Sequence, residues 1–549
     1  MARLTFADLE ARSRAEAPAL DKPKIKVGLS TCGIAAGAEP VFAALGQEVK
    51  SRGLEWRVAR TGCAGMCSME PLVEVDLPGQ DPAMFGGVTP EFARQLVAAA
   101  ADGGTLPAEN RVPGIAELAR VAGEPVAAEG PRQYRIVMRN CGVIDPEEID
   151  EYLDWGGYQA LAKVLSSMTP EQVIEELKIS GVRGRGGAGF PAWLKWNLTR
   201  ESKGDEHLIV CNGDEGDPGA YMDRSVLEGD PHAVLEGMIL GGYVIGAKQG
   251  FFYIRAEYPL AIQRIERALR QARAAGLLGN NILGTDFSFN VEIRLGAGAF
   301  VCGEETALIA SVEGKRGTPS PRPPYPSVRG LWGQPTMINN VESLANMSQI
   351  LLRGGEWFSG IGMGKSTGTK VFAVTGKVKH AGLVEIPMGM TLREVVEGIC
   401  GGSATGSPIK AVQTGGPSGG LIPARELDTP ITYEHLQKLG SYMGSGGMIV
   451  MDETDDLVEL SKFYLGFCVD ESCGKCAPCR IGGTQMLRLL DRIASGKGSD
   501  QDIVTIRRLA HAMQKASLCG LGQGAPSPIL SALRYFEPEF RGRLASSKN

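Results

Sequence analysis

Four cysteines near the C-terminus constrain this chain more than any other feature of its sequence. Cys473, Cys476 and Cys479 form a C-x2-C-x2-C run, and Cys519 follows farther along in SLCGLG. Three thiolates at this spacing can hold three irons of a cubane, and a distant fourth can close it. Zinc is the rival metal, but zinc sites usually pair two C-x2-C knuckles. The pattern favours a [4Fe–4S] cluster over zinc, and over four free thiols.

Length and composition restrict the protein class. The chain has 549 residues, of which 43% are hydrophobic and 22% charged, as is typical of several globular domains. Its net charge of −6 gives no reason to expect nucleic acid as a partner. The N-terminus lacks the apolar core of a secretory signal, and the apolar stretch 237–247 is too short to span a bilayer. We therefore expect a cytoplasmic protein without direct membrane insertion.

Element patterns predict an α/β and α+β multidomain chain. Residues 22–105 have the order β-α-β-β-α of a small thioredoxin-like domain, and 103–131 have a linker's composition. Strands and helices alternate over 132–360, as in an α/β domain. Residues 366–430 resemble a β-grasp domain, because a hairpin precedes a short helix. Amphipathic stretches over 431–549 predict a helical bundle around the cysteines.

A glycine-rich loop at 181–191, GVRGRGGAGFP, contains a literal G-x-G-x-x-G. A Rossmann loop must follow a strand, whereas 169–180 has helical spacing, so we do not predict that fold. The glycines still let backbone N–H groups face a ligand, and Arg183 and Arg185 add charge for a phosphate. Lys195 follows, suited to a phosphate or a flavin edge. A ligand loop is favoured over a solvated surface turn.

Polar residues cluster in two further segments. The first, VCNGDEGDPGAYMDR (210–224), places several acids after a predicted strand. Such carboxylates suit Mg²⁺ or Ca²⁺, or accept hydrogen bonds from ribose or nicotinamide amides, and the sequence does not separate these ligands. The second, PTMINNVESL (335–344), offers Asn339 and Asn340 as neutral donors for phosphate or ribityl oxygens.

Together these motifs resemble the NADH-binding flavoprotein subunit of respiratory complex I and its soluble relatives. These relatives include the diaphorase subunits of NAD-linked hydrogenases and formate dehydrogenases. The resemblance covers about residues 132–540. It rests on the following segments in order: GVRGRGGAGFPAWLKW, NGDEGDPGAYMDR, YIRAEYP, GAGAFVCGEETALIASVEGKRG, INNVES and ESCGKCAPCR with SLCG.

The resemblance implies that the chain binds FMN, one [4Fe–4S] cluster and NAD(H). It places at FMN Gly184, Arg185, Gly186, Lys195, Asn212, Asp214, Tyr253, Glu257, Asn339 and Asn340. It places at the nicotinamide nucleotide Gly187, Phe190, Lys195, Glu215, Asp217, Glu257 and Tyr258. It assigns the cluster to Cys473, Cys476, Cys479 and Cys519. Hydride would pass between the two cofactors, so no catalytic side chain is expected. Complex I members carry Glu where this chain has Asp217, and usually Gly at Ala256.

The N-terminal region resembles the thioredoxin-like [2Fe–2S] ferredoxins that accompany this flavoprotein. That family uses four cysteines, whereas this chain offers Cys32, Cys63 and Cys67, with Ala36 and Gly37 where a second ligand is expected. Either a group other than cysteine completes a cluster, or the domain has lost it and is structural.

Three kinds of enzyme complex that contain such a subunit fit the resemblance. The NGDEGDPGAYMDR segment and the thioredoxin-like domain fused at the N-terminus look most like those of the β subunit of an NAD-dependent formate dehydrogenase. Its partner would be a large catalytic subunit with a molybdenum or tungsten cofactor and iron–sulfur clusters. The alternatives are the diaphorase subunit of an NAD-reducing hydrogenase, with hydrogenase subunits as partners, and the complex I flavoprotein itself. A non-catalytic electron-wiring subunit is the alternative of another class.

Overall fold

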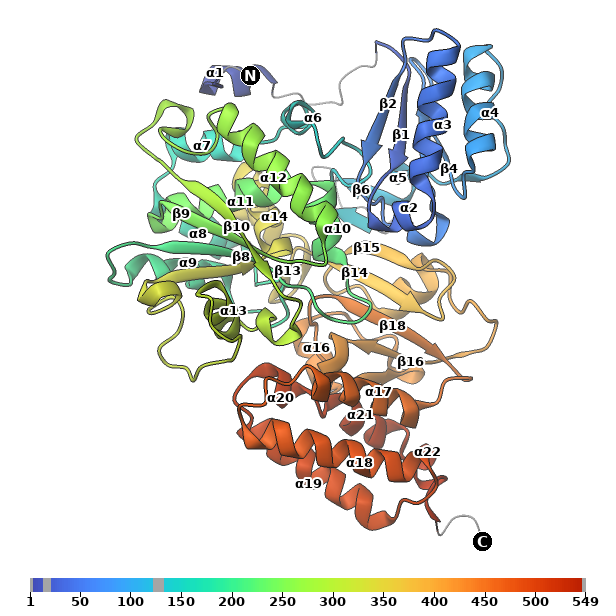
Figure 1. Cartoon of the computed structure of the whole chain (residues 1–549), viewed down its shortest axis with the longest axis vertical. Coiled ribbons are helices and arrows are strands. Elements are labelled where there is room, and N and C mark those ends of the chain that lie inside the picture. Colours follow the sequence, from blue (N-terminus) through green and yellow to red (C-terminus); the bar gives the residue numbers. More distant parts are fainter. Residues whose placement is uncertain (1–2, 13–20, 122–132, 546–549) are drawn as a thin grey trace.

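The computed structural model describes residues 3–12, 21–121 and 133–545. An N-terminal sheet unit, a central α/β unit, a mixed five-stranded sheet and a C-terminal helical bundle follow one another along the chain (Figure 1). Residues 122–131 of the expected linker lie outside the described residues. The rest of that linker is partly regular, with β5 (Arg111–Val112), α5 (Ile115–Leu118) and β6 (Ala119–Val121), which pairs in parallel with β7 (Gln133–Arg135).

The N-terminal unit is a sheet of order β2-β1-β3-β4-β5 with helices packed on it. Its remaining elements are β1 (Lys24–Gly28), α2 (Thr31–Ala35), α3 (Ala38–Ser51), β2 (Arg57–Thr61), β3 (Val73–Asp76), β4 (Ala83–Phe85) and α4 (Pro90–Ala101). Ile25 and Val27 alternate along β1 and are fully buried with Leu45 of α3. The Thr89 hydroxyl accepts a hydrogen bond from the Phe92 N–H at 3.2 Å, which caps α4.

The central unit is built on a sheet of order β10-β9-β8-β11 in which all neighbours are parallel. Its first elements are α6 (Ile149–Asp154), α7 (Gln159–Ser167), α8 (Pro170–Ser180), α9 (Ala192–Glu201), β8 (Leu208–Gly213), α10 (Met222–Gly229) and α11 (Pro231–Ile245). It continues with β9 (Gln249–Arg255), α12 (Pro259–Ala274), β10 (Asn290–Gly296), α13 (Glu305–Val312), β11 (Thr336–Asn340), α14 (Val341–Arg353) and α15 (Gly355–Ser359). The N-terminal helix α1 (Phe6–Arg12) packs on α6 and α7.

Both faces of this parallel sheet are covered. Ile209 and Cys211 of β8 belong to the large core that includes α11 and α14, whereas Val210 belongs to a second core with Val301 and Leu308. Burial on both faces explains why β8 is a continuous apolar run rather than an alternating one.

The third unit is a mixed sheet of order β15-β14-β18-β16-β17. Its elements are β14 (Thr369–Gly376), β15 (Gly382–Pro387), a π-helical turn (Glu394–Ile399), β16 (Ile409–Thr414), β17 (Leu421–Pro423), α16 (Tyr433–Lys438) and β18 (Gly447–Asp452). The short hairpin β12 (Gly362–Met363) and β13 (Ser366–Thr367) precedes them. The sheet extends beyond the predicted range 366–430, because β18 inserts between β14 and β16. Residues 447–452 were predicted to belong to the bundle, and the pairing of β18 corrects that prediction.

The C-terminal bundle has its own core around Leu465, Leu490 and Ile506. It contains α17 (Leu457–Asp470), α18 (Gly483–Ala494), α19 (Asp500–Ala516), α20 (Gly520–Gly524), α21 (Ser527–Tyr535) and α22 (Glu537–Arg541). A π-helical turn, Pro478–Gly482, precedes α18.

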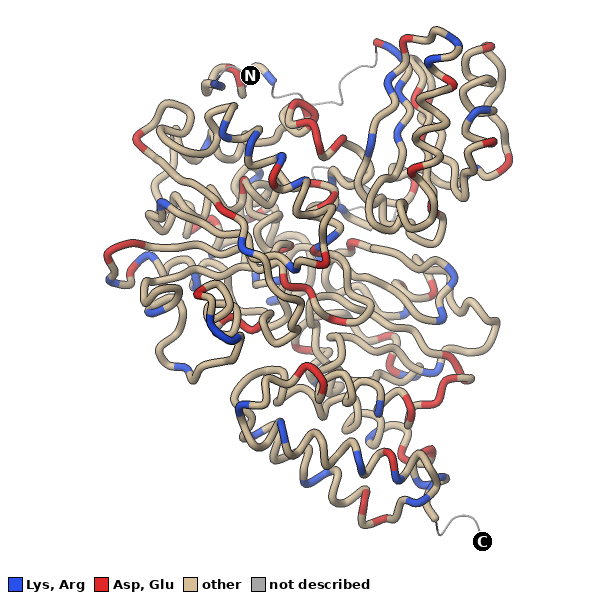
Figure 2. Tube along the Cα trace, viewed as in Figure 1, with Lys and Arg blue, Asp and Glu red and all other residues tan. Residues whose placement is uncertain are grey.

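Charged residues of both signs occur throughout the described ranges. Figure 2 shows acidic and basic residues interspersed along the tube. The apolar stretch 237–247 lies largely within α11, a buried helix of 15 residues. Within the described ranges, none of the helices combines the length and hydropathy needed to cross a bilayer.

Candidate functional site

The carboxyl ends of the four parallel strands bring the predicted polar residues to one edge of the central sheet. Asn212 near the end of β8 is in register with Tyr253 of β9 on one side and Asn340 of β11 on the other. Asp214 and Glu257 follow the ends of β8 and β9. Ligands of open α/β sheets bind in the crevice outside these strand ends. The sheet therefore assembles segments that are far apart in the sequence.

The glycine loop approaches this edge from the helical side. It connects α8 to α9, and Thr169 caps α8 with a side-chain bond to the Gln172 N–H, so the preceding element is a helix as predicted. A Cβ added to Gly186 would lie 3.1 Å from the Asn340 Cβ, so the loop rests on the end of β11. Gly187 has φ +113°, a conformation that favours glycine.

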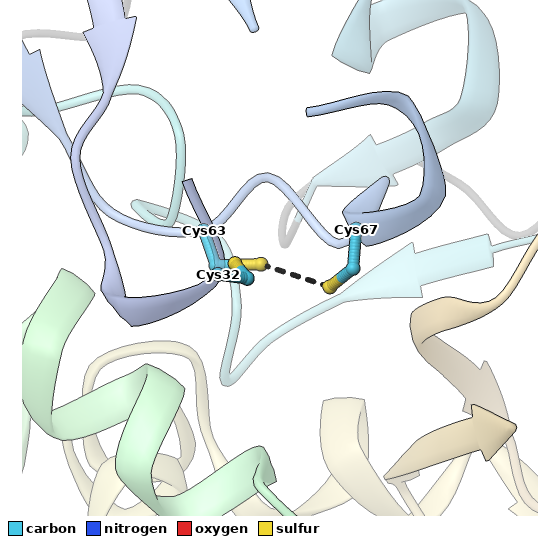
Figure 3. Close-up of side chains that lie close together, drawn as sticks. All are labelled: Cys32, Cys63 and Cys67. Atoms are coloured by element: carbon cyan, nitrogen blue, oxygen red, sulfur yellow. Dashed lines mark hydrogen bonds between the residues drawn. The ribbon is translucent and has the colours of Figure 1, made fainter. Parts of the chain in front are cut away.

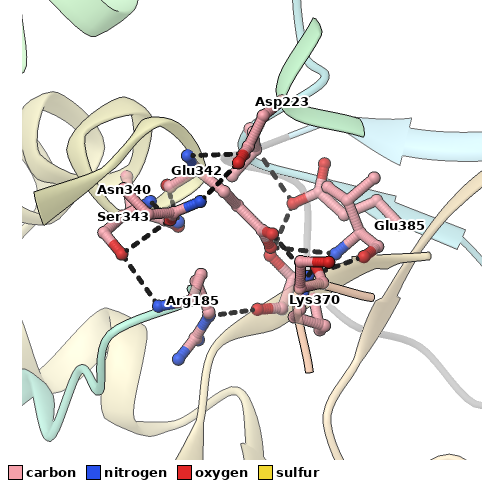
Figure 4. Close-up of polar contacts among 12 residues, drawn as sticks. Arg185, Asp223, Asn340, Glu342, Ser343, Lys370 and Glu385 are labelled. Atoms are coloured by element: carbon pink, nitrogen blue, oxygen red, sulfur yellow. Dashed lines mark hydrogen bonds and ion pairs between the residues drawn. The ribbon is translucent and has the colours of Figure 1, made fainter. Parts of the chain in front are cut away.

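The two arginines of this loop hold its shape. The Arg183 guanidinium stacks 4.1 Å from the Tyr433 ring centroid and lies 2.6 Å from a Glu434 carboxylate oxygen. Arg185 is fully buried and donates to the carbonyls of Arg183, Thr367 and Thr369. Figure 4 shows its position beside Ser343 and Lys370. The guanidinium of Arg185 therefore orders the loop through backbone carbonyls, and its predicted place at FMN stays a prediction.

Asn340 is also engaged within the protein. Its side-chain oxygen accepts from the Ser343 N–H at 2.9 Å and caps α14, and its amide donates to Asp223 at 2.7 Å (Figure 4). Beside it, the buried Glu342 pairs with the buried Lys370. These contacts hold the Asn340 side chain at the end of β11, and its place at FMN stays a prediction.

Asn339 differs from its neighbour. It is 6% exposed, and its side-chain nitrogen has no hydrogen-bond partner within the described part of the chain. Nearby, the Lys195 ammonium donates to the Ile338 carbonyl at 3.0 Å and lies 3.7 Å from Glu305. A buried, unsatisfied amide costs free energy unless a ligand accepts from it. The free amide, the lysine and the glycine loop fit an isoalloxazine and its phosphate.

Other residues predicted to line FMN have protein partners. The Asn212 amide donates to the Gly303 carbonyl at 3.0 Å, and its oxygen accepts from the Asp214 N–H at 3.0 Å. Tyr253 is buried and donates to the Ser311 hydroxyl at 2.9 Å. These contacts fix the shape of the edge.

The acids of the NGDEGDP segment are buried, and burial raises their pKa values. Burial raises the pKa of Asp214 to about 7, against the opposing charge of Arg255. Burial likewise raises the pKa of Glu215 to about 7, although two backbone N–H groups donate to its carboxylate, and that of Asp217 to about 6. Near neutral pH this segment therefore carries less negative charge than its sequence suggests.

The remaining residues predicted at the nucleotide lie around these acids. Glu257 pairs with Arg255 at 3.0 Å, and the Tyr258 hydroxyl donates to the Glu215 carbonyl at 2.6 Å. The Phe190 ring, which ends the glycine loop, is 43% exposed. An exposed aromatic ring beside a ligand loop suits contact with a planar ring.

The four C-terminal cysteines line one pocket, as predicted. Cys473 follows α17, Cys476 precedes the next π-helical turn, Cys479 lies within that turn, and Cys519 immediately precedes α20. Among the described residues, no three of their sulfurs lie within 4.8 Å of one another. Sulfurs on one tetrahedral zinc are about 3.8 Å apart, given Zn–S bonds of about 2.3 Å. The four sulfurs therefore share one pocket without the close grouping expected around one zinc ion.

The segment that follows β10 joins the strand edge to the cysteine pocket. Val301 and Pro319 line the pocket with the cysteines, and Lys475 donates to the Pro319 carbonyl at 2.7 Å. The Phe300 N–H donates to Glu471 at 2.9 Å. Cys473 packs against the core that covers the second face of the central sheet. The two predicted cofactor sites are therefore connected through packed protein.

The N-terminal cysteines also converge. The sulfurs of Cys32, Cys63 and Cys67 lie within 4.8 Å of one another, with Cys63 and Cys67 3.5 Å apart (Figure 3). Glu70, which the sequence motifs did not reveal, approaches Cys32 at 3.8 Å, and burial raises its pKa to about 8. Its position three residues after Cys67 was the only signal in the sequence.

Comparison with known proteins adds a family. Three family models match, namely the Nuo51 FMN-binding domain over residues 177–349, the SLBB domain over 371–421 and the NADH-ubiquinone oxidoreductase-F iron-sulfur binding region over 459–543. The chain is 39% identical over 412 residues to the NADH-quinone oxidoreductase F subunit of Escherichia coli (strain K12), covering 75% of this chain and 93% of the relative. The chain belongs to the flavoprotein family of NADH-quinone oxidoreductase, or complex I. FMN and a [4Fe–4S] cluster are therefore its cofactors.

Other members of this flavoprotein family belong to hydrogenases. The chain is 54% identical over 417 residues to NADP-reducing hydrogenase subunit HndC of Solidesulfovibrio fructosivorans, covering 76% of this chain and 85% of the relative. A crystal structure of NAD⁺-reducing [NiFe]-hydrogenase in the H₂-reduced state aligns with a TM-score of 0.66 at 28% identity, over 98% of this chain and 87% of that one. That likeness spans the N-terminal unit as well.

Proposed function

We propose that this chain is a diaphorase subunit that exchanges electrons between NAD(H) and an iron–sulfur relay. The observation that carries the proposal is the glycine loop and the unpartnered Asn339 amide at one sheet edge, joined by packed protein to a four-cysteine pocket. When bound, FMN supplies hydride exchange with nicotinamide and single-electron exchange with a cluster.

The residues of the chain bind and orient rather than react. We assign the flavin to the backbone of 184–187, the Asn339 amide and the Lys195 ammonium, whose charge favours an anionic group. Phe190 supplies an exposed ring against which a nicotinamide can lie. Asp214, held partly protonated by burial, reduces repulsion of a nucleotide that brings its own phosphates.

The direct test is turnover of the whole chain with its cofactors. We expect the purified chain to reduce ferricyanide with NADH and to release FMN on denaturation. The matched comparison is Phe190→Ala, which should raise KM for NADH while FMN content is unchanged. A chain that binds no flavin and does not oxidise NADH would instead support the electron-wiring alternative.

Which enzyme complex contains this subunit is a separate proposal. The residues of the NGDEGDPGAYMDR segment and the fused N-terminal unit favour an NAD-dependent formate dehydrogenase. The similarity to hydrogenase subunits favours an NAD-reducing hydrogenase instead. The large subunit that co-purifies with the chain decides between them by its metal. Molybdenum or tungsten supports formate oxidation, and nickel supports hydrogen oxidation.

A further inference from the structure

The three N-terminal thiols are arranged for one metal ion rather than two. Cys32 lies in the first turn of α2, Cys63 in the loop after β2, and Cys67 at the start of a 3₁₀ turn. All three sulfurs are mutual neighbours within 4.8 Å (Figure 3). A two-iron cluster divides its ligands between irons on opposite sides of two bridging sulfides, so three of its thiolates cannot all be neighbours. One tetrahedral ion places its sulfurs about 3.8 Å apart.

A carboxylate lies beside this set: Glu70 approaches Cys32, although its oxygens are not within 4.8 Å of all three sulfurs. One Glu70 oxygen lies 3.8 Å from the Cys32 sulfur, and the other accepts from the Leu72 N–H at 2.8 Å. Within the described residues Glu70 forms no ion pair with a basic side chain. A Cβ added to Gly28 or Gly33 would lie 3.0 or 3.2 Å from the Glu70 carboxylate, so glycine at both positions leaves it room.

We propose that Cys32, Cys63 and Cys67 bind one divalent transition-metal ion, with zinc as the first candidate, and that a shift of the neighbouring Glu70 side chain completes its coordination. Zinc accepts thiolate and carboxylate ligands together in a four-coordinate tetrahedral site. Three thiolates and a carboxylate exceed its charge. Arg135 offsets part of the excess, because it is fully buried, interacts electrostatically with Cys63 and donates to the Ala64 carbonyl at 2.7 Å.

The ion would fasten the junction between the N-terminal and central units. Next to Cys32, the Thr31 N–H donates to Glu228 of α10 at 2.8 Å. Between Cys63 and Cys67, the Gly65 carbonyl accepts from the Leu383 N–H of β15 at 2.9 Å. The loops that carry the thiols are thus the loops that touch the rest of the molecule. A structural metal here stabilises the attachment of the whole N-terminal unit.

Metal analysis of the purified, FMN-loaded full chain tests this proposal. We expect about four irons from the cubane and about one zinc per chain. Cys67→Ser and Glu70→Gln should lose the zinc and keep the iron, whereas the matched control Glu74→Gln, on the adjoining strand, should keep both. Growth with Co²⁺ should give a thiolate-to-cobalt absorption that is absent in Cys67→Ser.

Two results would overturn the proposal. About six irons per chain with a second iron–sulfur signal on reduction would establish a two-iron cluster. A chain that contains no metal beyond the iron of the cubane would show that the three N-terminal thiols bind no metal ion. Should Cys67→Ser fail to fold, Glu70→Gln still decides, because glutamine can accept the Leu72 hydrogen bond and the four C-terminal irons report folding.

Discussion

At the scale of single residues, the unpartnered Asn339 amide is the most informative group of the site. Because a hydrogen bond contributes about 0.5–1.5 kcal/mol, Asn339→Ala should weaken FMN binding by up to about tenfold. Titration of FMN with flavin-free chain, followed by the fluorescence of the unbound FMN, measures this affinity. Asn290→Ala, at the amino end of β10 on the same sheet, is the control and should bind FMN like the unaltered chain. Equal affinities for all three would remove Asn339 from the flavin site.

The buried acids predict a pH dependence. Burial raises the folded-state pKa of Asp214 to about 7, above its unfolded value near 3.8. Its stabilising contribution is complete at low pH and is lost as pH rises through about 7. The thermal midpoint of the flavin-free chain should therefore fall between about pH 5 and pH 8, and fall less in Asp214→Asn. The exposed Asp286→Asn should reproduce the unaltered profile, and an unchanged profile in Asp214→Asn would refute the argument.

At the scale of elements, the glycine loop depends on backbone conformations that alanine resists. Gly187 has φ +113° and a Cβ there would lie 3.1 Å from Gly444, whereas Gly246, which ends α11, has φ +72° and open space around it. Alanine at either position should cost about 1–2 kcal/mol of stability. Only Gly187→Ala should also lose FMN, as flavin content per purified chain would show. Loss of FMN in both variants would point to general destabilisation.

Sequence patterns predicted the elements that depend on local signals. Thr169 and Pro170 marked the start of α8, and this helix correctly argued against a Rossmann loop. The strand β18 was missed, because a short apolar run among helices gives no clear period and its pairing with β14 is set by tertiary contacts.

The candidate site was predictable in place but not in detail. The cysteine spacing alone identified the pocket of Cys473 and Cys519. The role of Arg185 was not predictable, since the carbonyls it binds belong to Thr367 and Thr369, far along the chain. A motif fixes which residues gather, whereas long-range packing decides which of them stay free for a ligand.

At the scale of the whole molecule, a buried ion pair joins the central unit to the mixed sheet. Glu342 of α14 and Lys370 of β14 are 1% and 0% exposed, and Lys370 also donates to the Ser445 carbonyl (Figure 4). Lys370→Met leaves a buried carboxylate unpaired and should cost about 3–5 kcal/mol, seen as a lower thermal midpoint. Adding Glu342→Gln to this variant should restore part of the lost stability. The exposed pair Lys462–Asp491 is the control, and Lys462→Met should cost about 0–1 kcal/mol.

Across the molecule, we expect the glycine-loop edge and the cysteine pocket to form one electron path. The most direct test adds NADH without oxygen to the purified chain and follows flavin absorbance and the paramagnetic signal of the reduced cluster. We predict that NADH bleaches the flavin and produces the cluster signal, that Cys476→Ser keeps the first and loses the second, and that flavin-free chain shows neither. A cluster that NADH reduces without FMN, or leaves oxidised while the flavin is reduced, would contradict this electron path.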